Sequence, residues 1–402
     1  MLSVDRAIEA ILARCRPLPA RRTCLLDALG LALAEPIAAD LDLPPFDKAL
    51  MDGYAVRSVD LDGPLPRRLL VVDEISAGRM PTRPLLEFEA ARIMTGAPLP
   101  PGADAVVPFE QSRPDGPDVL IPGPFRPRQN RMIRGREMKA GDALLAPGAV
   151  LGAASLGLIA SAGRGEILAT PRPIIAVVPT GDELVPPSRF PGPGQIRNSN
   201  GVMLAALARS WGATEVRESP IAPDDPDALG AALLGAIRGS DVAIISGGVS
   251  AGRKDHVPAT LEALGVEPVF HKVNVKPGKP LWFGVAPRTE GRPPTLVFGL
   301  PGNPVSGVVG FLLFVKPALD ALAGLPQRPR PGPGFPLAAP FEHRGDRPTY
   351  HPARMEGGRL HPMAWAGSAD LRTVALADGF AAFPPGDRSH AEGDEVEFLP
   401  LR

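Results

Sequence analysis

Three glycine-rich loops carry most of the side chains in this sequence that could do chemistry. Each follows an apolar run of strand length, in IIAVVPTGDELV (174–185), in VAIISGGVSAGRKDHV (242–257) and in the stretch from Thr295 to Leu322. In the third, an apolar pattern of helical length follows the loop, which predicts a strand that leads into a helix. Backbone N–H groups at such a junction, together with the helix dipole, favour the binding of an oxyanion.

Acidic residues in the first two loops predict either a metal site or helix caps. Asp182 and Glu183 follow Gly181, just beyond the end of the predicted strand. Mg²⁺ in proteins takes one or two carboxylates together with substrate phosphates, so this pair is a candidate magnesium site. The alternative is an N-cap and the first turn of a helix, where acidic residues are favoured. Asp255, in the second loop, is a candidate metal or proton-transfer group, or else the cap of the helix that follows.

The second loop combines glycines with hydroxyl side chains. Gly247 and Gly248 allow a ligand to approach the backbone closely, and Ser246 and Ser250 add hydroxyl groups beside them. Residues 248–252 also match the G-x-S-x-G motif of hydrolases, but the predicted strand ends at Ser246, several residues before Ser250. We therefore expect this loop to bind an anion and not to supply a nucleophile.

Basic residues follow on a turn between the second and third loops. Lys276 and Lys279 flank Pro277 and Gly278, and such a pair is either solvated surface or part of an anion site. The arginine-rich stretch FRPRQNRMIRGREMK (125–139) has almost no aromatic residues beside it, which favours a solvated hairpin over a nucleic-acid surface. We expect no nucleic-acid partner.

The elements that position these residues form an α/β pattern. Residues 172–325 alternate predicted strands with predicted helices at 200–211, 225–238 and 255–264. This texture predicts a central, doubly wound α/β domain with a parallel sheet. Its three loops then converge at the carboxyl ends of the strands, where open α/β sheets bind ligands.

The rest of the chain predicts three smaller units, which makes the protein a multidomain α/β protein. A small helical module, residues 1–43 plus 138–171, has a helix capped by Ser3 and a second predicted helix at 25–34. Short apolar runs separated by turn residues predict an inserted β-rich domain at 44–137. A linker rich in proline and glycine leads into a C-terminal β domain, residues 326–402.

Composition limits the classes of protein to which the chain can belong. With 402 residues, 44% hydrophobic residues and a net charge of −1, it has the composition of a folded protein and not of one that binds polyanions by bulk charge. The two cysteines, Cys15 and Cys24, fit no zinc or redox spacing; both are expected in a core, which indicates a reducing cytoplasm. We expect no membrane span and no signal peptide, and neither a P-loop nor a G-x-G-x-x-G motif occurs.

Seven motifs together resemble those of one enzyme family. FDKALMDGYAV, RIMTGAPLPPGADAVV, PTGDEL, GQIRNSN, SGGVSAGRKDH, VKPGKP and LPGNPVS occur in this order over nearly the whole chain. In order and spacing they are similar to those of the molybdopterin molybdenumtransferases, the MoeA-type enzymes of molybdenum cofactor biosynthesis. The resemblance implies four domains, an elongated homodimer, and an active site between the α/β domain of one subunit and the β domain of the other.

The resemblance also implies a reaction. Adenylylated molybdopterin and molybdate are the substrates, the phosphoanhydride is hydrolysed with Mg²⁺ to release AMP, and molybdenum enters the dithiolene. The upstream adenylyltransferase and apo-molybdoenzymes are the partner proteins that it suggests. Two alternatives stay open: a molybdopterin adenylyltransferase, which typically consists of the α/β domain alone, and a non-catalytic scaffold of the same architecture.

Matching the family motifs residue by residue assigns roles in this sequence. The catalytic residues it implies are Asp52, Thr95, Glu183 and Asp255. The metal ligands it implies are Asp182, Glu183 and Asp225. The substrate-binding residues it implies are Ser246, Gly247, Gly248, Ser250, Lys276, Lys279, Pro301, Gly302, Asn303, Pro304, Ser306, Arg354 and Ser368. Where relatives usually have a Glu–Asp pair, this chain has Arg136 and Glu137, so a contact made by that pair is in question.

Overall fold

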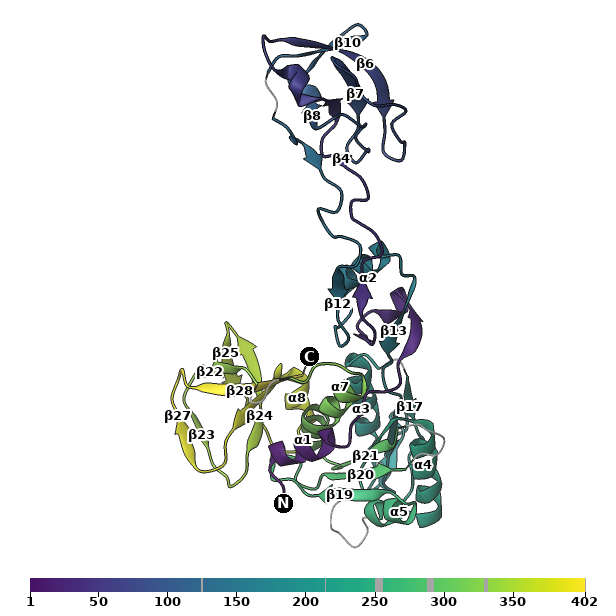
Figure 1. Cartoon of the computed structure of the whole chain (residues 1–402). Helices are drawn as coiled ribbons and strands as arrows, with labels where there is room; N and C mark the ends of the chain where they lie inside the picture. The colour runs from purple at the N-terminus through teal and green to yellow at the C-terminus, as the bar shows by residue number, and fades with distance from the viewer. Residues whose placement is uncertain (124–125, 214, 250–255, 288–292, 329–331, 402) are drawn as a thin grey trace.

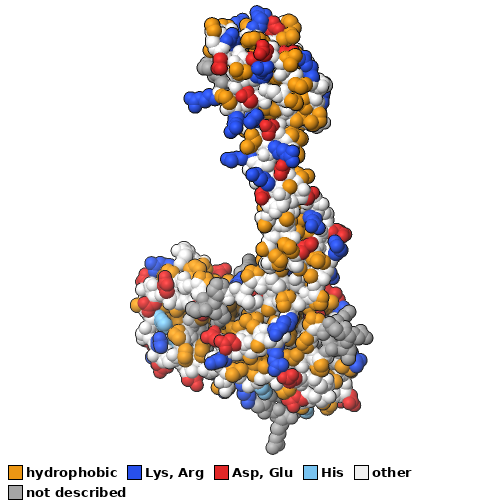
Figure 2. All heavy atoms as spheres, in the orientation of Figure 1, with side chains coloured by type: hydrophobic (Ala, Val, Ile, Leu, Met, Phe, Trp, Pro, Cys, Tyr) orange, Lys and Arg blue, Asp and Glu red, His pale blue; other side chains and the backbone are white. Residues whose placement is uncertain are grey.

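The chain folds into an elongated molecule, seen in the computed structural model as a ribbon in Figure 1 and with all heavy atoms in Figure 2. Residues 1–123, 126–213, 215–249, 256–287, 293–328 and 332–401 are described. A β domain lies at one end, joined by an extended stalk to a small mixed module, which rests on the α/β domain (Figure 1). The C-terminal β domain lies beside the α/β domain (Figure 1). The predicted multidomain architecture is confirmed, and the domain limits themselves stay predictions.

The α/β domain is built on a six-stranded sheet. Its central strands are continuous apolar runs buried on both faces, as is usual for parallel strands covered by helices. Across the sheet the strands are β17 (Val216–Glu218), β14 (Ile175–Pro179), β18 (Val242–Ser246), β21 (Thr295–Leu300), β20 (Trp282–Ala286) and β19 (Glu267–His271). The first four are parallel, as predicted, and the last two extend the sheet in antiparallel fashion.

The three predicted helices of this domain are confirmed as α3 (Ser199–Ser210), α4 (Pro226–Gly239) and α5 (Val257–Ala263). The helix predicted after the third loop is divided into α6 (Pro304–Gly310), a π-helical segment η4 (Phe311–Val315) and α7 (Lys316–Leu322). Residues 304–322 are long and apolar enough to span a membrane, but 83% of that window is buried inside the fold. This burial is typical of a core helix, and α7 packs against α1 (Val4–Leu12), which Ser3 caps as predicted.

The small module contains less helix than predicted. Residues 25–34 form a 3-10 turn η1 (Leu26–Ala28) and a short strand β2 (Ala32–Leu33), so the predicted second helix is wrong. Gly30 between them has φ +75°, a left-handed conformation that ends a helix. Cys24 is exposed, which corrects its expected place in a core, whereas Cys15 is buried. The other elements are β1 (Arg21–Cys24), β13 (Glu166–Thr170), α2 (Ala153–Ser161), β3 (Ile37–Ala38) and β12 (Ala143–Leu145).

The inserted β domain has a six-stranded sheet at the far end of the stalk. Across it lie β8 (Ala105–Pro108), β5 (Gly53–Val56), β7 (Glu89–Ile93), β6 (Arg67–Ile75), β10 (Asp118–Ile121) and β9 (Arg113–Asp115). Two 3-10 turns, η2 (Ser58–Leu61) and η3 (Phe109–Gln111), pack around it. At its base, β11 (Arg131–Met132) in the arginine-rich stretch pairs with β4 (Lys48–Ala49) and not with its own sequence neighbours, so the predicted local hairpin is wrong.

The C-terminal domain is the predicted β domain, and its main sheet is antiparallel. Its strands are, in order across the sheet, β22 (Gly334–Pro336), β28 (Glu395–Pro400), β26 (Gly379–Phe383), β24 (Thr349–Glu356) and β25 (Arg359–Pro362). A two-stranded pair, β23 (Phe341–His343) and β27 (Arg388–His390), and a short helix α8 (Leu371–Leu376) complete it. The domain packs against α6 through α8, which places it next to the third glycine loop.

Candidate functional site

The three glycine loops meet at the carboxyl ends of β14, β18 and β21. We call them the TGDE loop (residues 180–183), the SGG loop (246–248) and the PGNP loop (301–304). The backbone N–H of Thr180 donates to the carbonyl of Ser246 at 2.9 Å, and the N–H of Gly247 donates to the carbonyl of Leu300 at 3.1 Å. The sheet thus brings together segments more than 120 positions apart, since the loops run from residue 180 to residue 304.

One side chain that the sequence did not single out joins two of these loops. Asn200 lies in the first turn of α3, and its Nδ2 donates to Ser246 Oγ at 2.9 Å and to the Gly302 carbonyl at 2.7 Å. In the sequence, Asn200 closes the GQIRNSN motif at the start of a predicted helix, and the motif assigned it no role. That position does not distinguish a loop contact from an ordinary cap.

The glycines of the SGG loop adopt conformations that other residues avoid. Gly247 and Gly248 have φ angles of +101° and +63°, and Ser246 before them is only 3% exposed. Their left-handed backbone is compatible with the predicted anion-binding nest. Ser250 and Asp255 lie outside the described residues, so their predicted roles stay predictions.

The acidic residues of the site have local partners. Asp182 Oδ1 accepts a hydrogen bond from the Asp224 backbone N–H at 3.0 Å. Asp225 Oδ1 accepts from the Ala228 N–H at 2.9 Å and so caps α4. The Glu183 carboxylate folds back over Gly181. Among the described residues, no group of three His, Cys, Asp or Glu side chains gathers closely enough to hold a metal ion.

These carboxylates therefore do not form a complete cation site by themselves. A hard cation at this edge would need oxygen atoms from a bound phosphate in addition to one or two carboxylates. Asp182 could contribute one oxygen, because the bond from Asp224 uses only the other. Asp225 has a structural role as the N-cap of α4, and its metal role stays a prediction.

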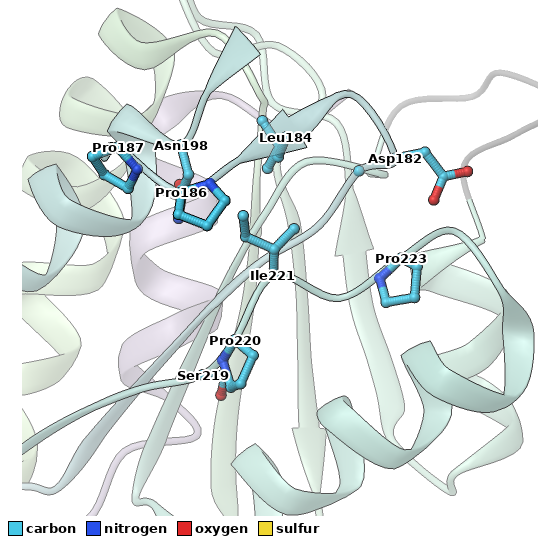
Figure 3. Close-up of a pocket in the computed structure, with 10 residues that line it drawn as sticks. Asp182, Leu184, Pro186, Pro187, Asn198, Ser219, Pro220, Ile221 and Pro223 are labelled. Atoms are coloured by element: carbon cyan, nitrogen blue, oxygen red, sulfur yellow. The ribbon is translucent and has the colours of Figure 1, made fainter. Parts of the chain in front are cut away.

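A pocket of about 570 Å³ adjoins the TGDE loop. Figure 3 shows Leu184, Pro186, Asn198 and Ile221 facing one another across it, while the carboxylate of Asp182 points away from them. The pocket wall is mostly proline and aliphatic, so it suits an apolar or planar group. The acidic group lies at its margin.

The C-terminal domain reaches the PGNP loop. Asn303 Nδ2 donates to Ser368 Oγ at 2.9 Å, and the Val305 N–H donates to the Ser368 carbonyl at 3.1 Å. Pro301 precedes this loop's glycine, Gly302, and Pro304 begins α6, in which Ser306 is 3% exposed. The structure thus brings Ser368 to the loop.

Arg354, which the family motifs placed with Ser368, has other contacts. Its Nε donates to the Leu376 carbonyl at 3.1 Å, and its Nη1 lies 3.9 Å from a Glu356 oxygen. Within the described part of the chain, no hydrogen bond joins it to Ser368. Its predicted role in binding stays a prediction without support from this geometry.

The turn of Lys276 and Lys279 is also held by the C-terminal domain. The Lys276 N–H donates to the Pro348 carbonyl at 2.9 Å, and its carbonyl accepts from the Tyr350 N–H at 2.8 Å. A Cβ built on Gly278 would lie 3.7 Å from the Ser306 carbonyl oxygen, so the turn and α6 are neighbours. Burial and the nearby charge of Lys276 lower the pKa of His343, which leaves that imidazole neutral at pH 7.

Asp52 and Thr95 lie in the β domain and form a tight pair. Asp52 Oδ1 accepts hydrogen bonds from the Thr95 backbone N–H and from Thr95 Oγ1, both at 2.7 Å. These two bonds, the backbone bond first, lower the pKa of Asp52. Thr95 follows β7, at the opposite end of the molecule from the glycine loops (Figure 1), so one chain does not bring the pair to the loops.

A second pocket, of about 730 Å³, lies in the same domain; Tyr54, Arg92 and Phe109 are among the residues that line it, and Asp52 and Thr95 are not. Arg92 lies over the ring of Phe109 at 5.2 Å, and the Phe109 N–H donates to the Asp52 carbonyl at 3.2 Å. Phe109 lies in none of the quoted motifs, and Arg92 begins the motif RIMTGAPLPPGADAVV, which assigned it no role. Near the base of this domain, Glu137 lies 3.5 Å from Lys48, and Arg136 is exposed.

The chain matches known proteins over its full length. Residues 2–163 match the MoeA N-terminal region (domains I and II), residues 176–321 a probable molybdopterin binding domain, and residues 335–401 the MoeA C-terminal region (domain IV). The molybdopterin molybdenumtransferase of Staphylococcus aureus is 34% identical over 99% of this chain and 95% of its own length. The chain belongs to the molybdopterin molybdenumtransferase family. Molybdopterin molybdenumtransferase 2 of Mycobacterium tuberculosis is 35% identical over 99% of this chain and 98% of its own length.

The fold agrees with this family. The crystal structure of a MoeA protein from Pyrococcus horikoshii superposes with a TM-score of 0.83 at 32% identity, covering 100% of this chain and 99% of that one. The family consists of transferases, so the prediction that this protein is an enzyme of the molybdopterin molybdenumtransferase class is confirmed.

Proposed function

We propose that this protein inserts molybdenum from molybdate into adenylylated molybdopterin and releases AMP. The observation that carries the proposal is the convergence of the TGDE, SGG and PGNP loops and the lysine turn at one sheet edge, in a chain that matches molybdenumtransferases over 99% of its length. A phosphoanhydride and a divalent oxyanion both need backbone N–H donors and cations, which this edge supplies.

Each part of the edge has a proposed task. The SGG and PGNP loops would bind the pterin substrate through Ser246, Gly247, Gly248 and Gly302, with Asn303 and Ser368 fixing the third loop. Lys276 and Lys279 would hold molybdate next to Ser306. The C-terminal domain orients this turn, because its backbone pairs with Lys276.

The acidic residues fit Mg²⁺ only with substrate oxygens as additional ligands. Asp182 would contribute a carboxylate oxygen. Glu183 is its neighbour in sequence, and Asp225 follows Asp224, whose N–H donates to Asp182. When bound, Mg²⁺ would neutralise charge on the phosphoanhydride. The chain's own contribution is to hold Asp182 in place through the Asp224 N–H and to present Glu183, the proposed catalytic acid or base, over Gly181.

A second subunit would complete the site. Asp52 and Thr95 are proposed catalytic residues, yet their domain lies far from the loops of the same chain (Figure 1). A homodimer in which the β domain of one subunit covers the α/β domain of the other would bring them together. Exposed apolar side chains on the α/β domain and the small module supply area for such contacts, namely Phe190 (86% exposed), Ile196 (57%), Leu26 (87%) and Leu29 (61%). We place the enzyme in the cytoplasm, in contact with the upstream adenylyltransferase and with apo-molybdoenzymes.

Reconstitution tests the proposal. Purified protein, adenylylated molybdopterin, Mg²⁺ and molybdate should yield AMP and activate an apo-molybdoenzyme, and activation should require molybdate. Formation of adenylylated molybdopterin from ATP and molybdopterin, without molybdenum insertion, would identify an adenylyltransferase instead. Binding of the pterin with neither product would identify a scaffold.

A further inference from the structure

We propose that Asn200 is a positioning residue that fixes the separation of the SGG and PGNP loops and thereby sets the substrate affinity of the site. The inference rests on the proposed function for the identity of the substrate. The geometric part of it rests only on contacts within the chain.

The orientation of the Asn200 amide is determined by its partners. The Gly302 carbonyl, 2.7 Å away, can only accept a hydrogen bond, so the NH₂ group must face it. The second hydrogen of the same NH₂ group is donated to Ser246 Oγ at 2.9 Å. Asn200 Oδ1 is buried and has no partner among the described residues. A rotated amide would lose both donor bonds and would set its oxygen against the Gly302 carbonyl, so the two loops hold Asn200 in one orientation.

Asn200 is fixed to the rest of the domain by helix α3. The N-cap of this helix is Asn198, whose Oδ1 accepts from the Gly201 N–H at 2.9 Å, and Leu204 and Ala205 of the next turn are completely buried. Side-chain bonds from a buried helix therefore reach the ends of both loops. A flexible surface residue could not define their positions in the same way.

The two loops are close enough for a small displacement to matter. A Cβ built on Gly302 would lie 3.8 Å from Gly247 Cα, so the loop backbones are nearly in van der Waals contact. Any substrate group that binds both loops meets N–H and carbonyl groups whose spacing depends on this contact. Without the two hydrogen bonds of Asn200 the loops can move apart. Part of the free energy of substrate binding is then used to order them, which weakens binding.

Two variants at this position test the inference in the full-length protein. Asn200→Ala removes both bonds, and Asn200→Asp keeps the shape of the side chain while replacing the donor by an acceptor that the Gly302 carbonyl repels. Asn130→Asp is the matched control, because Asn130 Nδ2 also donates to a backbone carbonyl, that of Val106 at 2.9 Å, but in the β domain. Amide hydrogen exchange at Gly247 and Gly302 and the dissociation constant of adenylylated molybdopterin are measured for each.

For both Asn200 variants we expect exchange at Gly247 and Gly302 to rise about tenfold and the dissociation constant to rise about tenfold, the effect of losing roughly one net hydrogen bond. The Asn130 control should change neither. Unchanged exchange at the two glycines, or unchanged affinity despite faster exchange, would overturn the proposal. If the wild-type protein does not bind the substrate, the proposed function fails, and exchange alone still decides whether Asn200 holds the loops.

Discussion

Replacing Gly247 by alanine should damage the SGG loop by an amount that can be worked out from the structure. Gly247 has φ +101°, and a Cβ built on it would lie 2.6 Å from the Thr180 carbonyl oxygen. The backbone conformation alone costs a non-glycine residue about 1–3 kcal/mol, offset by about 0.4–1 kcal/mol because the unfolded chain becomes less flexible. The contact with Thr180 adds to the cost, since a backbone oxygen of the neighbouring strand end cannot rotate away.

The net loss of about 1–2 kcal/mol should lower the unfolding midpoint of the α/β domain by roughly 2–8 °C. Differential scanning calorimetry of the full-length protein measures this shift. Gly302→Ala is the matched control, because Gly302 has no positive φ and its Cβ would meet only Gly247 Cα at 3.8 Å, an ordinary contact. Equal midpoints for the two variants would refute the argument that the left-handed backbone and the Thr180 contact constrain this loop.

Three further outcomes are expected. Thr95→Val removes one hydrogen-bond donor to Asp52 and should therefore raise the pKa of Asp52, which NMR titration measures. Because the pKa of Asp52 is lowered in the folded protein, the stability that this carboxylate contributes is present above its unfolded pKa and is lost as the pH falls through its folded pKa. An unchanged titration curve in the variant would contradict the bond. Burial raises the pKa of the Cys15 thiol to about 12, whereas Cys24 is exposed. In the native protein a thiol reagent should therefore modify Cys24 rapidly and Cys15 only on unfolding. Rapid modification of both cysteines would contradict the burial of Cys15. Chelation of divalent cations should abolish AMP release, and adding Mg²⁺ should restore it. The unfolding midpoint should not change, because no cluster among the described residues holds a cation without substrate. A large drop in the midpoint would show a structural metal.

The α/β domain was predictable because its signals are local. Continuous apolar runs such as 242–246 form parallel strands buried on both faces, and each is followed by a glycine loop. The helix predicted at 25–34 was wrong because the leucines and alanines there have helical spacing, while Gly30 between them has a left-handed conformation that ends a helix. The pairing of Arg131–Met132 with Lys48–Ala49 was not predictable, because it joins the two sides of a stalk more than 80 positions apart.

The site was predictable as far as motifs reached. The convergence of Ser246 and Gly302 follows from parallel strands. The contact of Ser368 with the PGNP loop was not predicted, and its role in binding substrate stays a prediction. Asn200 was missed because its role depends on where the start of a helix falls relative to two distant loops. The role of Arg354 stays a prediction, because its printed contacts are with Leu376 and Glu356 and do not test substrate binding.

The central claim is that one molecule of AMP leaves for each molybdenum inserted. A single-turnover experiment with excess enzyme, radiolabelled adenylylated molybdopterin, Mg²⁺ and molybdate gives this ratio directly when AMP and molybdenum-loaded cofactor are counted in the same sample. We predict equal amounts, with neither product formed by an Asp182→Asn variant that folds normally. AMP release at full rate in the absence of molybdate, with no loaded cofactor when molybdate is present, would contradict the claim.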